Sequence, residues 1–580
     1  MRTIRMTGFA AALGALLVAP VLAGASSTDV LVSNGSPTTP FSQNKQNEPA
    51  IAVNANSPNV LVAGSNDEID EQGCNGSSCP FTPGIGVSGV YFSFDSGQTW
   101  TQPTYDGYSA RNCLSGPCTP VAGGPIGTLP WYFENGVVSD GDPGLAFGPK
   151  PGANGFSWTN GARLYYSNLT SNFPTGAAFK GFEAIGISRT DDVATASLTG
   201  TPAQEQAAKN AWMPPVLISK QSNTTFSDKE QIWADNASSS PFFGNVYVCW
   251  AMFQGQEKSP HATPAQLQVA VSSDGGTTWT QHPLGAAANN RERSPLDGCT
   301  VRTDSHGNAF VFGKGTVSSA GKQTFELMSV STTGGSTWST PTPVVGPVTQ
   351  PGVFDPVQGR PEIDGITGAR SDLANAPSVD IANGAPTGSD ATDRIVMSYV
   401  SGTINQQHVY FTESSNHGGS WSTPRAIEAS GDYGIYTAPS ISPNGTDVYV
   451  VYNAFTTQYQ TDTTNPRELV GVMTHADVSG AGTGSFTELH RGASGDARGS
   501  STNSLTDEFL GDYVYAAATR TYGAAVWNDA RNALSCSAVE TWRASLETPT
   551  PGTKPSPGAV CPATFGNTNI YGGAYNDPSP

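Results

Sequence analysis

Two short patterns recur along most of the chain, and they restrict its fold more than any other feature of the sequence. The first, S-x-D-x-G-x-T-W, occurs as SFDSGQTW, SSDGGTTW, STTGGSTW and SSNHGGSW, at residues 93–100, 272–279, 331–338 and 414–421. Each copy follows an alternating apolar run, so the pattern predicts a hairpin turn between two strands. Thr333 and Asn416 replace the Asp in two copies, which favours a structural role for the pattern over a shared catalytic one.

The second pattern is a pair of apolar strands that recurs seven times. Its first strands start at Glu48, Asp142, Lys229, Asp297, Ala376, Ala438 and Asp512. Only 13% of the residues are charged, and 66 Gly and 43 Pro make the chain rich in turns, as in all-β proteins. Repeated units of this kind bury their sheet faces against one another. We therefore predict an all-β fold, a β-propeller of seven four-stranded antiparallel blades, or of six if the second unit is incomplete.

The seventh unit lacks a strand at its C-terminal side. Residues 538–546 read as its third strand, and the sequence then turns into the Pro- and Gly-rich segment TPTPGTKPSPG. The N-terminal segment Thr28 to Ser36 has a strand pattern, so we expect it to pair into the last blade and close the ring. This division predicts a signal peptide at 1–25, a propeller domain at 26–547 and a C-terminal extension at 548–580.

The first residues and the cysteines predict an exported protein. Arg2 and Arg5 precede an apolar run and small residues that end at Ala25, as in a secretory signal peptide. Eight cysteines follow, and we predict the disulfides Cys74–Cys79, Cys113–Cys118, Cys249–Cys299 and Cys536–Cys561. The formal net charge of −19 argues against nucleic acid and anionic membranes as partners. We expect a secreted monomer, extracellular or periplasmic.

The alternation of inner strands with S-x-D-x-G-x-T-W turns resembles the Asp-box proteins (bacterial neuraminidase repeat) of the sialidase superfamily. The resemblance covers roughly residues 46–547 and implies a propeller that acts on or binds extracellular glycans. A sialidase is expected to start its first inner strand with Phe/Tyr-Arg-Ile-Pro, whose arginine joins two others on the sugar carboxylate. Here the stretch reads Asn47-Glu48-Pro49-Ala50, so an acid stands where the first arginine is expected.

The starts of first strands and the ends of second strands lie at the same face of a propeller, where they form a mouth on the axis. Acidic residues gather at these positions in the sequence. As the catalytic carboxylates of a glycoside hydrolase we predict Asp67, Asp142 and Asp512. The resemblance implies a tyrosine nucleophile, for which we predict Tyr513, with Tyr436 as the alternative. As substrate-binding residues we predict Glu48, Asp297, Arg360, Asp529 and Arg531.

Two functions stay open at this point. The working hypothesis is a glycoside hydrolase of the sialidase type, in which two carboxylates with separated pKa values flank the glycosidic bond. The alternative is a propeller that binds glycans or proteins without catalysis, where the same acids hold sugar hydroxyls or a calcium ion. We predict no cofactor, apart from the calcium ion of this alternative. Nucleophile-elbow, zinc-protease and phosphate-loop motifs are absent from the sequence, so it shows no other catalytic signal.

Overall fold

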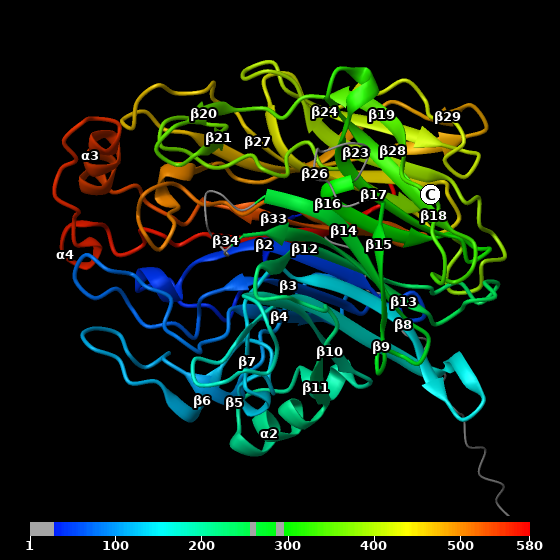
Figure 1. Cartoon of the computed structure of the whole chain (residues 1–580), viewed down its shortest axis with the longest axis horizontal. Helices are drawn as coiled ribbons and strands as arrows, with labels where there is room; N and C mark the ends of the chain where they lie inside the picture. Colours follow the sequence, from blue (N-terminus) through cyan, green and yellow to red (C-terminus); the bar gives the residue numbers. More distant parts are fainter. Residues whose placement is uncertain (1–27, 256–262, 286–294) are drawn as a thin grey trace, which may run out of the picture.

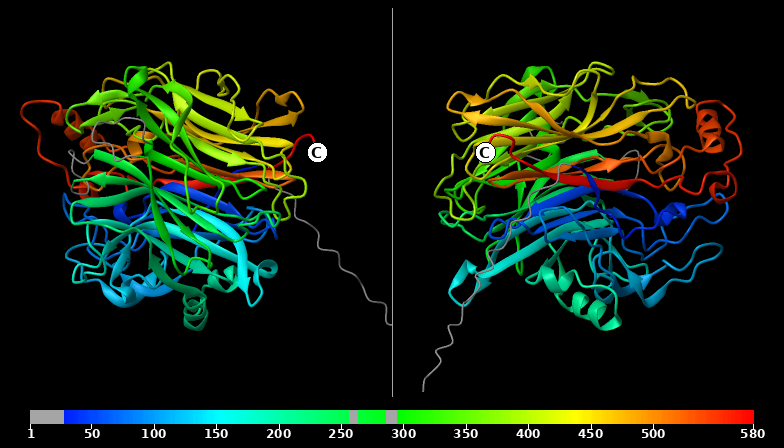
Figure 2. Two further views of the ribbon diagram at one scale, coloured as in Figure 1. Left: turned by 45° about the vertical axis from the view of Figure 1, so that its right-hand side comes forward. Right: turned by 180° about the vertical axis from the view of Figure 1, so that it is seen from behind.

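A computed structural model describes residues 28–255, 263–285 and 295–580, and its strands form the seven blades of a β-propeller. The predicted signal peptide, residues 1–25, lies outside the described residues. Figures 1 and 2 show the sheets fanning around one axis, with the blue N-terminal strands next to the red C-terminal one. The seven-bladed prediction is therefore confirmed, and the six-bladed alternative is wrong because the second unit is a complete blade.

The first strand of each blade lies nearest the axis. These strands are β2 (Gln46–Val53), β8 (Gly144–Gly152), β12 (Thr225–Ala234), β16 (Pro295–Thr303), β22 (Ser378–Ile381), β26 (Tyr433–Ile441) and β32 (Tyr515–Ala518). Each pairs antiparallel with the second strand: β3 (Leu61–Asp67), β9 (Gly155–Asn172), β13 (Val246–Gln254), β17 (Ala309–Val317), β23 (Ile395–Ser401), β27 (Asp447–Phe455) and β33 (Tyr522–Asp529). All seven predicted strand pairs are thus present.

The third and fourth strands complete the blades towards the rim. The third strands are β4 (Ser88–Ser93), β10 (Glu183–Thr190), β14 (Thr263–Ser272), β18 (Gln323–Ser331), β24 (His408–Ser414), β28 (Glu468–Ser479) and β34 (Asn569–Asn576). The fourth strands are β11 (Trp212–Leu217), β15 (Thr280–Leu284), β19 (Thr342–Val348), β25 (Arg425–Ala426), β30 (Thr487–Arg491) and β1 (Val30–Leu31). In the first blade, two isolated bridges to β4, between Phe92 and Thr101 and between Gly89 and Thr128, take the place of a fourth strand.

Ring closure follows the prediction in one respect and departs from it in another. The N-terminal β1 is the fourth strand of the last blade, as expected, and pairs with β34. The third strand of that blade is β34 itself, which lies inside the predicted C-terminal extension. Residues 538–546, predicted as the third strand, belong to helix α3 (Ser537–Leu546), which buries Val539 and Trp542 against Phe41 and Phe565. The helical spacing of these apolar residues prevails over their strand propensity.

Further elements add to the four-stranded pattern. The strands β7 (Val137–Ser139), β29 (Gly482–Thr483) and β31 (Gly495–Asp496) extend blade sheets by pairing with β9 or β28, whereas β5 (Tyr105–Ser109) with β6 (Val121–Ile126) and β20 (Val353–Asp355) with β21 (Arg360–Glu362) form separate two-stranded sheets. The helices are α1 (Val193–Ala196), α2 (Pro202–Asn210), α3 and α4 (Pro557–Val560), with 3-10 turns η1 (Phe41–Gln43), η2 (Phe133–Asn135), η3 (Ser318–Ala320) and η4 (Ala497–Gly499).

The hydrophobic core lies between neighbouring sheets all around the ring. Val62 and Val90 of the first blade pack with Leu164 of the second in one buried cluster. Another cluster joins Val526 of the last blade to Ala63 of the first, so burial is continuous across the closure. Each sheet therefore needs its neighbours to bury both of its faces, which is why the repeat folds as a ring.

The S-x-D-x-G-x-T-W turns connect third strands to the segments that follow them, as predicted. In the second copy, the carboxylate of Asp274 accepts the backbone N–H of Thr277 at 3.0 Å and that of Thr278 at 2.9 Å. Burial alone would raise the pKa of Asp274, but the hydrogen bonds from Thr278 lower it. Thr333 accepts the N–H of Thr337 in the third copy, so a hydroxyl replaces the carboxylate without loss of the turn.

All four predicted disulfides are present: Cys74–Cys79, Cys113–Cys118, Cys249–Cys299 and Cys536–Cys561. Cys249 and Cys299 join β13 to β16, so this bond links the third and fourth blades. Cys536 and Cys561 hold the segment of α3 and α4 close to the start of β34. In the part of the chain that the structure describes, no helix is long and apolar enough to cross a membrane.

Candidate functional site

Bulges near the start of first strands turn charged side chains towards the axis. The strand register shifts between Asn47 and Ala50 in β2 and between Asp228 and Gln231 in β12. Glu48 and Lys229 lie at these bulges with left-handed backbone, at φ 56° and φ 61°, and Asp142 before β8 has φ 53°. Non-glycine residues rarely adopt this backbone, so the fold enforces it where it re-aims a side chain.

These side chains form one ionic cluster at the axis, which we call the acidic mouth: Glu48, Asp142, Asp228, Lys229, Arg370 and Asp512. The Lys229 Nζ atom lies 2.7 Å from Asp512 Oδ2, 3.3 Å from Asp142 Oδ2 and 3.6 Å from Asp228 Oδ1. Arg370 binds Asp512 with two nitrogens, at 2.9 and 2.6 Å, and reaches Glu48 Oε1 at 3.2 Å. Each cation is therefore shared among several carboxylates.

Burial and mutual repulsion separate the pKa values of these acids. Burial and the charge of Asp142 raise the pKa of Glu48 well above its usual range. Burial opposes ionisation of Asp142 and Asp512 too, but Lys229 and Arg370 lower the pKa of both. Burial raises the pKa of Asp228 to about 7. The acidic mouth thus combines a carboxyl whose pKa is raised, Glu48, with two whose pKa values are lowered, Asp142 and Asp512.

Of the predicted site residues, Glu48, Asp142 and Asp512 meet in the acidic mouth. Tyr513 and Asp297 lie close to it. The Tyr513 hydroxyl is buried without a hydrogen-bond partner among the described residues, and burial together with the charges of Asp142 and Glu48 raises the pKa of its phenol. Asp297 lies 4.0 Å from Lys314 of the next strand. Arg360 pairs with Asp372 at 3.4 Å, and both side chains are more than 30% exposed.

Asp67 lies elsewhere and has a structural role. It is fully buried at the end of β3, where its carboxylate accepts hydrogen bonds from Tyr91 at 2.7 Å, Gln102 at 2.7 Å and Ser36 at 2.8 Å. These bonds hold the N-terminal segment and the first blade together. Among the described residues, Asp67 forms no ion pair or hydrogen bond with a member of the acidic mouth.

Asp529 and Arg531 also form a separate group. Arg531 pairs with Asp529 at 2.7 Å and with Asp29 of the N-terminal segment at 2.6 Å. Its guanidinium lies 3.9 Å from the ring centre of Tyr571. The pair therefore fixes the closing strands to each other, away from the acidic mouth.

Two members of the site were missed by sequence reasoning. Arg370 lies in the long connection between β21 and β22, outside both repeats, and its position is set by a bond from the Tyr436 hydroxyl to its carbonyl at 2.7 Å. Asn66 donates to Glu48 Oε2 at 2.7 Å and accepts the N–H of Asp142 at 2.7 Å. No sequence pattern around Arg370 points to the site. Asn66 lies at the end of the second strand β3, a position at which the sequence does predict residues of the mouth.

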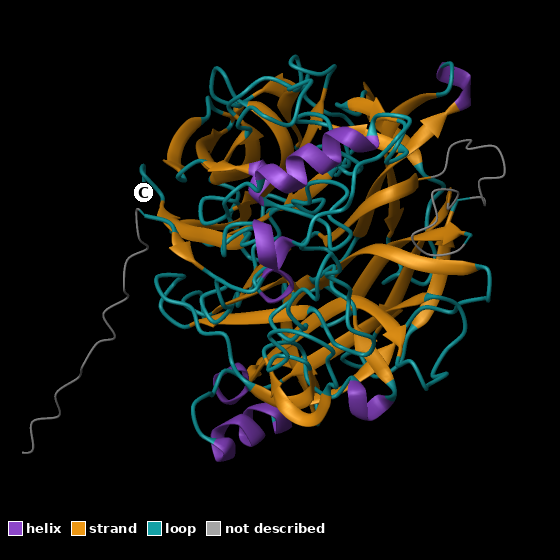
Figure 3. Ribbon diagram, turned by 90° about the vertical axis from the view of Figure 1, so that its left-hand side faces the viewer, coloured by secondary structure: helices purple, strands orange, loops and turns teal. Residues whose placement is uncertain are grey.

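Space at the acidic mouth is small. The cavity beside Lys229, Asp512 and Tyr513 has a volume of about 40 Å³, which admits only a few water molecules. Leu373 and Ala374, from the connection that carries Arg370, form part of its wall. Figure 3 faces the side where Figure 1 shows α3 and α4, and loops and short helices cover much of it.

The other end of the axis holds a much larger space, which we call the axial pocket. Its volume is about 540 Å³, and first strands of all seven blades contribute to its wall. The lining residues of these strands are Ile51, Ala52, Val53, Leu145, Ala146, Phe147, Trp233, Arg302, Asp380, Ile381, Ser440, Ile441, Ala516, Ala517 and Ala518. Most of them are apolar, as in small-molecule sites.

A few polar groups stand in this apolar wall. Arg302 lies 4.6 Å from the ring centre of Trp233 and pairs with Asp380 at 3.2 Å. Asp380 also accepts the Ser440 hydroxyl at 3.0 Å, and the Trp233 N–H donates to Thr303 at 2.9 Å. The axial pocket therefore offers a fixed array of charged and polar atoms beside an apolar surface. Sequence reasoning missed it because its strand residues read as ordinary core positions.

Fold and site define a seven-bladed β-propeller with an acidic and an apolar end. No protein-family model matches the chain, and no curated protein matches it by sequence. Among solved structures, a Hadza microbial sialidase shares 14% identity with this chain, with a TM-score of 0.38. The match covers 73% of this chain and 66% of the sialidase, so the chain spans less than two thirds of that protein's length.

Two further structures give similar values. An intramolecular trans-sialidase from Ruminococcus gnavus shares 12% identity over 73% of this chain and 94% of its own, with a TM-score of 0.37. A protein of unknown function from Dyadobacter fermentans shares 11% identity over 75% of this chain and 93% of its own, with a TM-score of 0.38. Similarities this distant do not indicate an activity.

Proposed function

We propose that this chain is an exported glycan-binding β-propeller that holds a glycan terminus in the axial pocket. One observation carries the proposal: a space of about 540 Å³, within the range of ligand sites, into which all seven first strands project. A sugar presents both C–H faces and hydroxyl groups. The wall offers a counterpart to each, with apolar residues such as Ile51 and Phe147 beside the polar atoms of Arg302 and Asp380.

The contrast with the acidic mouth supports binding over catalysis. At the acidic mouth, Lys229 and Arg370 are already shared among four carboxylates, and the adjoining cavity is about 40 Å³. A sugar could enter only by displacing these ion pairs. Among the ion pairs of the described residues, one arginine reaches this cluster, whereas recognition of a sialic acid carboxylate by the sialidase type needs three.

The disulfides support export. Four of them lie in the described residues, and such bonds persist in oxidising compartments. A protein with this chemistry encounters extracellular glycans, so a glycan is the partner that suits both the location and the wall of the axial pocket.

A glycan array with the full chain tests this proposal, followed by calorimetry on the tightest glycan. The variant Ala517→Phe fills part of the axial pocket, and we expect it to weaken binding at least 100-fold. Asp228→Asn alters the acidic mouth and serves as the control, with affinity within twofold of the wild type. Absence of binding to the array, or equal loss in both variants, contradicts the proposal.

A second candidate, glycoside hydrolysis at the acidic mouth, is favoured by one specific observation. Glu48 has a raised pKa and neighbouring Asp142 a lowered one, which is the pairing of acid and base that hydrolysis needs. Release of sugar by the wild type, with loss in both Glu48→Gln and Asp142→Asn, would establish it. We expect the wild type to release no sugar from any glycan of the array.

A further inference from the structure

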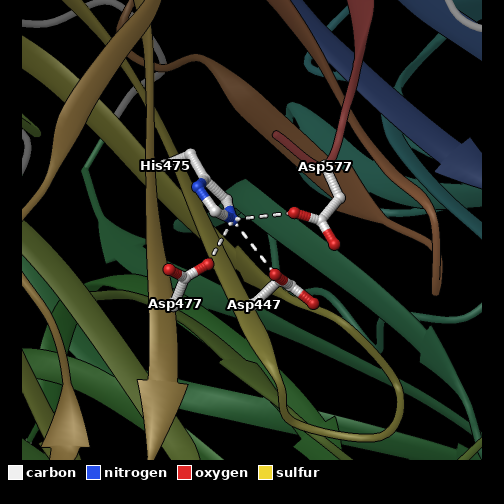
Figure 4. A group of neighbouring side chains, drawn as sticks. All are labelled: Asp447, His475, Asp477 and Asp577. Carbon is white, nitrogen blue, oxygen red and sulfur yellow. Dashed lines mark hydrogen bonds and ion pairs between the residues drawn. The ribbon is translucent and has the colours of Figure 1, made fainter. Parts of the chain in front are cut away.

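A group of one histidine and three aspartates joins the sixth and seventh blades. His475 and Asp477 are on β28, Asp447 is the first residue of β27, and Asp577 directly follows β34. One side-chain nitrogen or oxygen of each residue lies within 4.8 Å of those of the others. Figure 4 shows the three carboxylates pointing at the imidazole from different chain segments.

The four side chains lie close to one another, and three of them are largely shielded from solvent. His475 Nε2 lies 3.1 Å from Asp447 Oδ1, and 3.9 Å from Oδ1 of both Asp477 and Asp577. His475 and Asp447 are buried, and the side chain of Asp577 is 7% exposed. Asp477 is 64% exposed, so one side of the group is open to solvent.

A neighbouring phenol gives an independent sign of a ligand. Tyr449 is fully buried, and its hydroxyl has no hydrogen-bond partner among the described residues. Its ring lies 4.9 Å from that of His475. Tyr449 lies opposite His475 and Asp447 lies opposite Asp477 in the pairing of β27 with β28. Side chains two residues apart on a strand point to the same face, so the unpaired hydroxyl belongs to a residue on the face that carries His475, Asp447 and Asp477.

We propose that His475, Asp447, Asp577 and Asp477 bind one divalent transition-metal ion, with Zn²⁺ as the best match. Three carboxylate oxygens and one imidazole nitrogen make a mixed set of four ligands, as Zn²⁺ accepts in a tetrahedral site. Ca²⁺ and Mg²⁺ prefer oxygen ligands throughout, so the imidazole argues against them. The present spacings of 3.1–3.9 Å leave room for an ion after small side-chain rotations.

The ion would connect the sixth and seventh blades. His475 and Asp447 belong to the sixth blade, whereas Asp577 extends the strand that pairs with β1 in the seventh. Binding to the folded state alone stabilises that state, so the metal should raise the unfolding temperature.

The test uses the full chain after tag removal and treatment with a chelator. Calorimetric titration with Zn²⁺ should show one tight site, and His475→Gln should weaken it at least 100-fold. His408→Gln is the matched control, because His408 also pairs with an acidic side chain, Glu428, at 2.6 Å, but lies on β24 of the fifth blade and outside both groups of possible metal ligands. We expect this control to keep the tight site and its rise in unfolding temperature.

Asp477→Asn is the second variant, chosen because its exposed side chain is not needed for folding. It should weaken Zn²⁺ binding about tenfold and leave the unfolding temperature of the metal-free chain unchanged. Three results would overturn the proposal: no tight Zn²⁺ site in the wild type, equal affinity in His475→Gln and wild type, or tighter binding of Ca²⁺ than of Zn²⁺.

Discussion

The two ends of the propeller axis are made by the same seven first strands but differ in chemistry. At one end, bulges and left-handed residues bring Glu48, Asp142 and Lys229 into a closed ionic network. At the other, the strands continue regularly and leave an apolar space of about 540 Å³. Conspicuous charged residues in a repeat can thus hold the ring together, while ordinary strand residues line the larger space.

The largest effect is expected from removing the central cation of the acidic mouth. Lys229→Met leaves Asp142, Asp228 and Asp512 without their shared partner in a buried setting. We expect it to lower the free energy of unfolding by about 3–5 kcal/mol, as for other broken buried ion pairs. Denaturant unfolding measures this. Arg360→Met, at the exposed rim, is the control and should cost less than about 1 kcal/mol; equal losses would show that the network is not what holds this end.

Next in size is the effect of Trp233 on ligand binding at the opposite end. Trp233→Ala removes an aromatic wall of the axial pocket, so the affinity for the glycan found on the array should fall about tenfold, or about 1.4 kcal/mol. Trp279→Ala removes a partly buried tryptophan from a hairpin turn and should leave affinity unchanged. Calorimetry at one temperature compares the two. Loss of affinity in both variants would mean that the axial pocket is not the binding site.

A smaller effect on the free energy of unfolding is expected from replacing Glu48 of the acidic mouth by a neutral amide. Burial and the charge of Asp142 raise the pKa of Glu48 well above its usual range, so we expect a neutral amide of similar shape to replace it with little loss. Glu48→Gln is expected to change the free energy of unfolding by less than about 1 kcal/mol, the usual net contribution of a hydrogen bond. A loss as large as that of Lys229→Met would show that Glu48 is ionised in the folded protein.

The smallest effect is a pH dependence. The pKa of Asp228 is raised to about 7, above the ordinary value of an unfolded chain, so the folded state holds this proton more tightly. Stability from this group is therefore present at low pH and falls as the pH rises from about 4 to 7. The unfolding temperature of Asp228→Asn should decline less between pH 5.5 and 7.5 than that of the wild type. Identical slopes would contradict the shift.

The ring could be predicted from the sequence because its signals are local. The S-x-D-x-G-x-T-W turns and the seven strand pairs each occupy a short stretch, and the four disulfides follow from cysteine spacing and pairing in order. The missing third strand of the last blade was not found, because β34 follows a Pro- and Gly-rich segment that reads as an extension.

The site was predicted only in part, because its geometry depends on contacts between distant residues. Glu48, Asp142 and Asp512 were expected at the axis and meet there, but Arg370 lies in a connection without a repeat pattern. Asp67 had the right position in its strand, yet Tyr91 and Ser36 enclose it. Whether a strand-end acid faces the axis or its own blade depends on a bulge, which sequence periodicity does not reveal.

A crystal structure of the wild-type chain with the tightest glycan of the array tests the central claim most directly. We predict that the sugar lies in the axial pocket, with its hydroxyl groups near Arg302 and Asp380 and a C–H face on the apolar wall. A sugar bound instead between Lys229 and Arg370, with the ion pairs of the acidic mouth opened, would contradict the account and move the function to the other end.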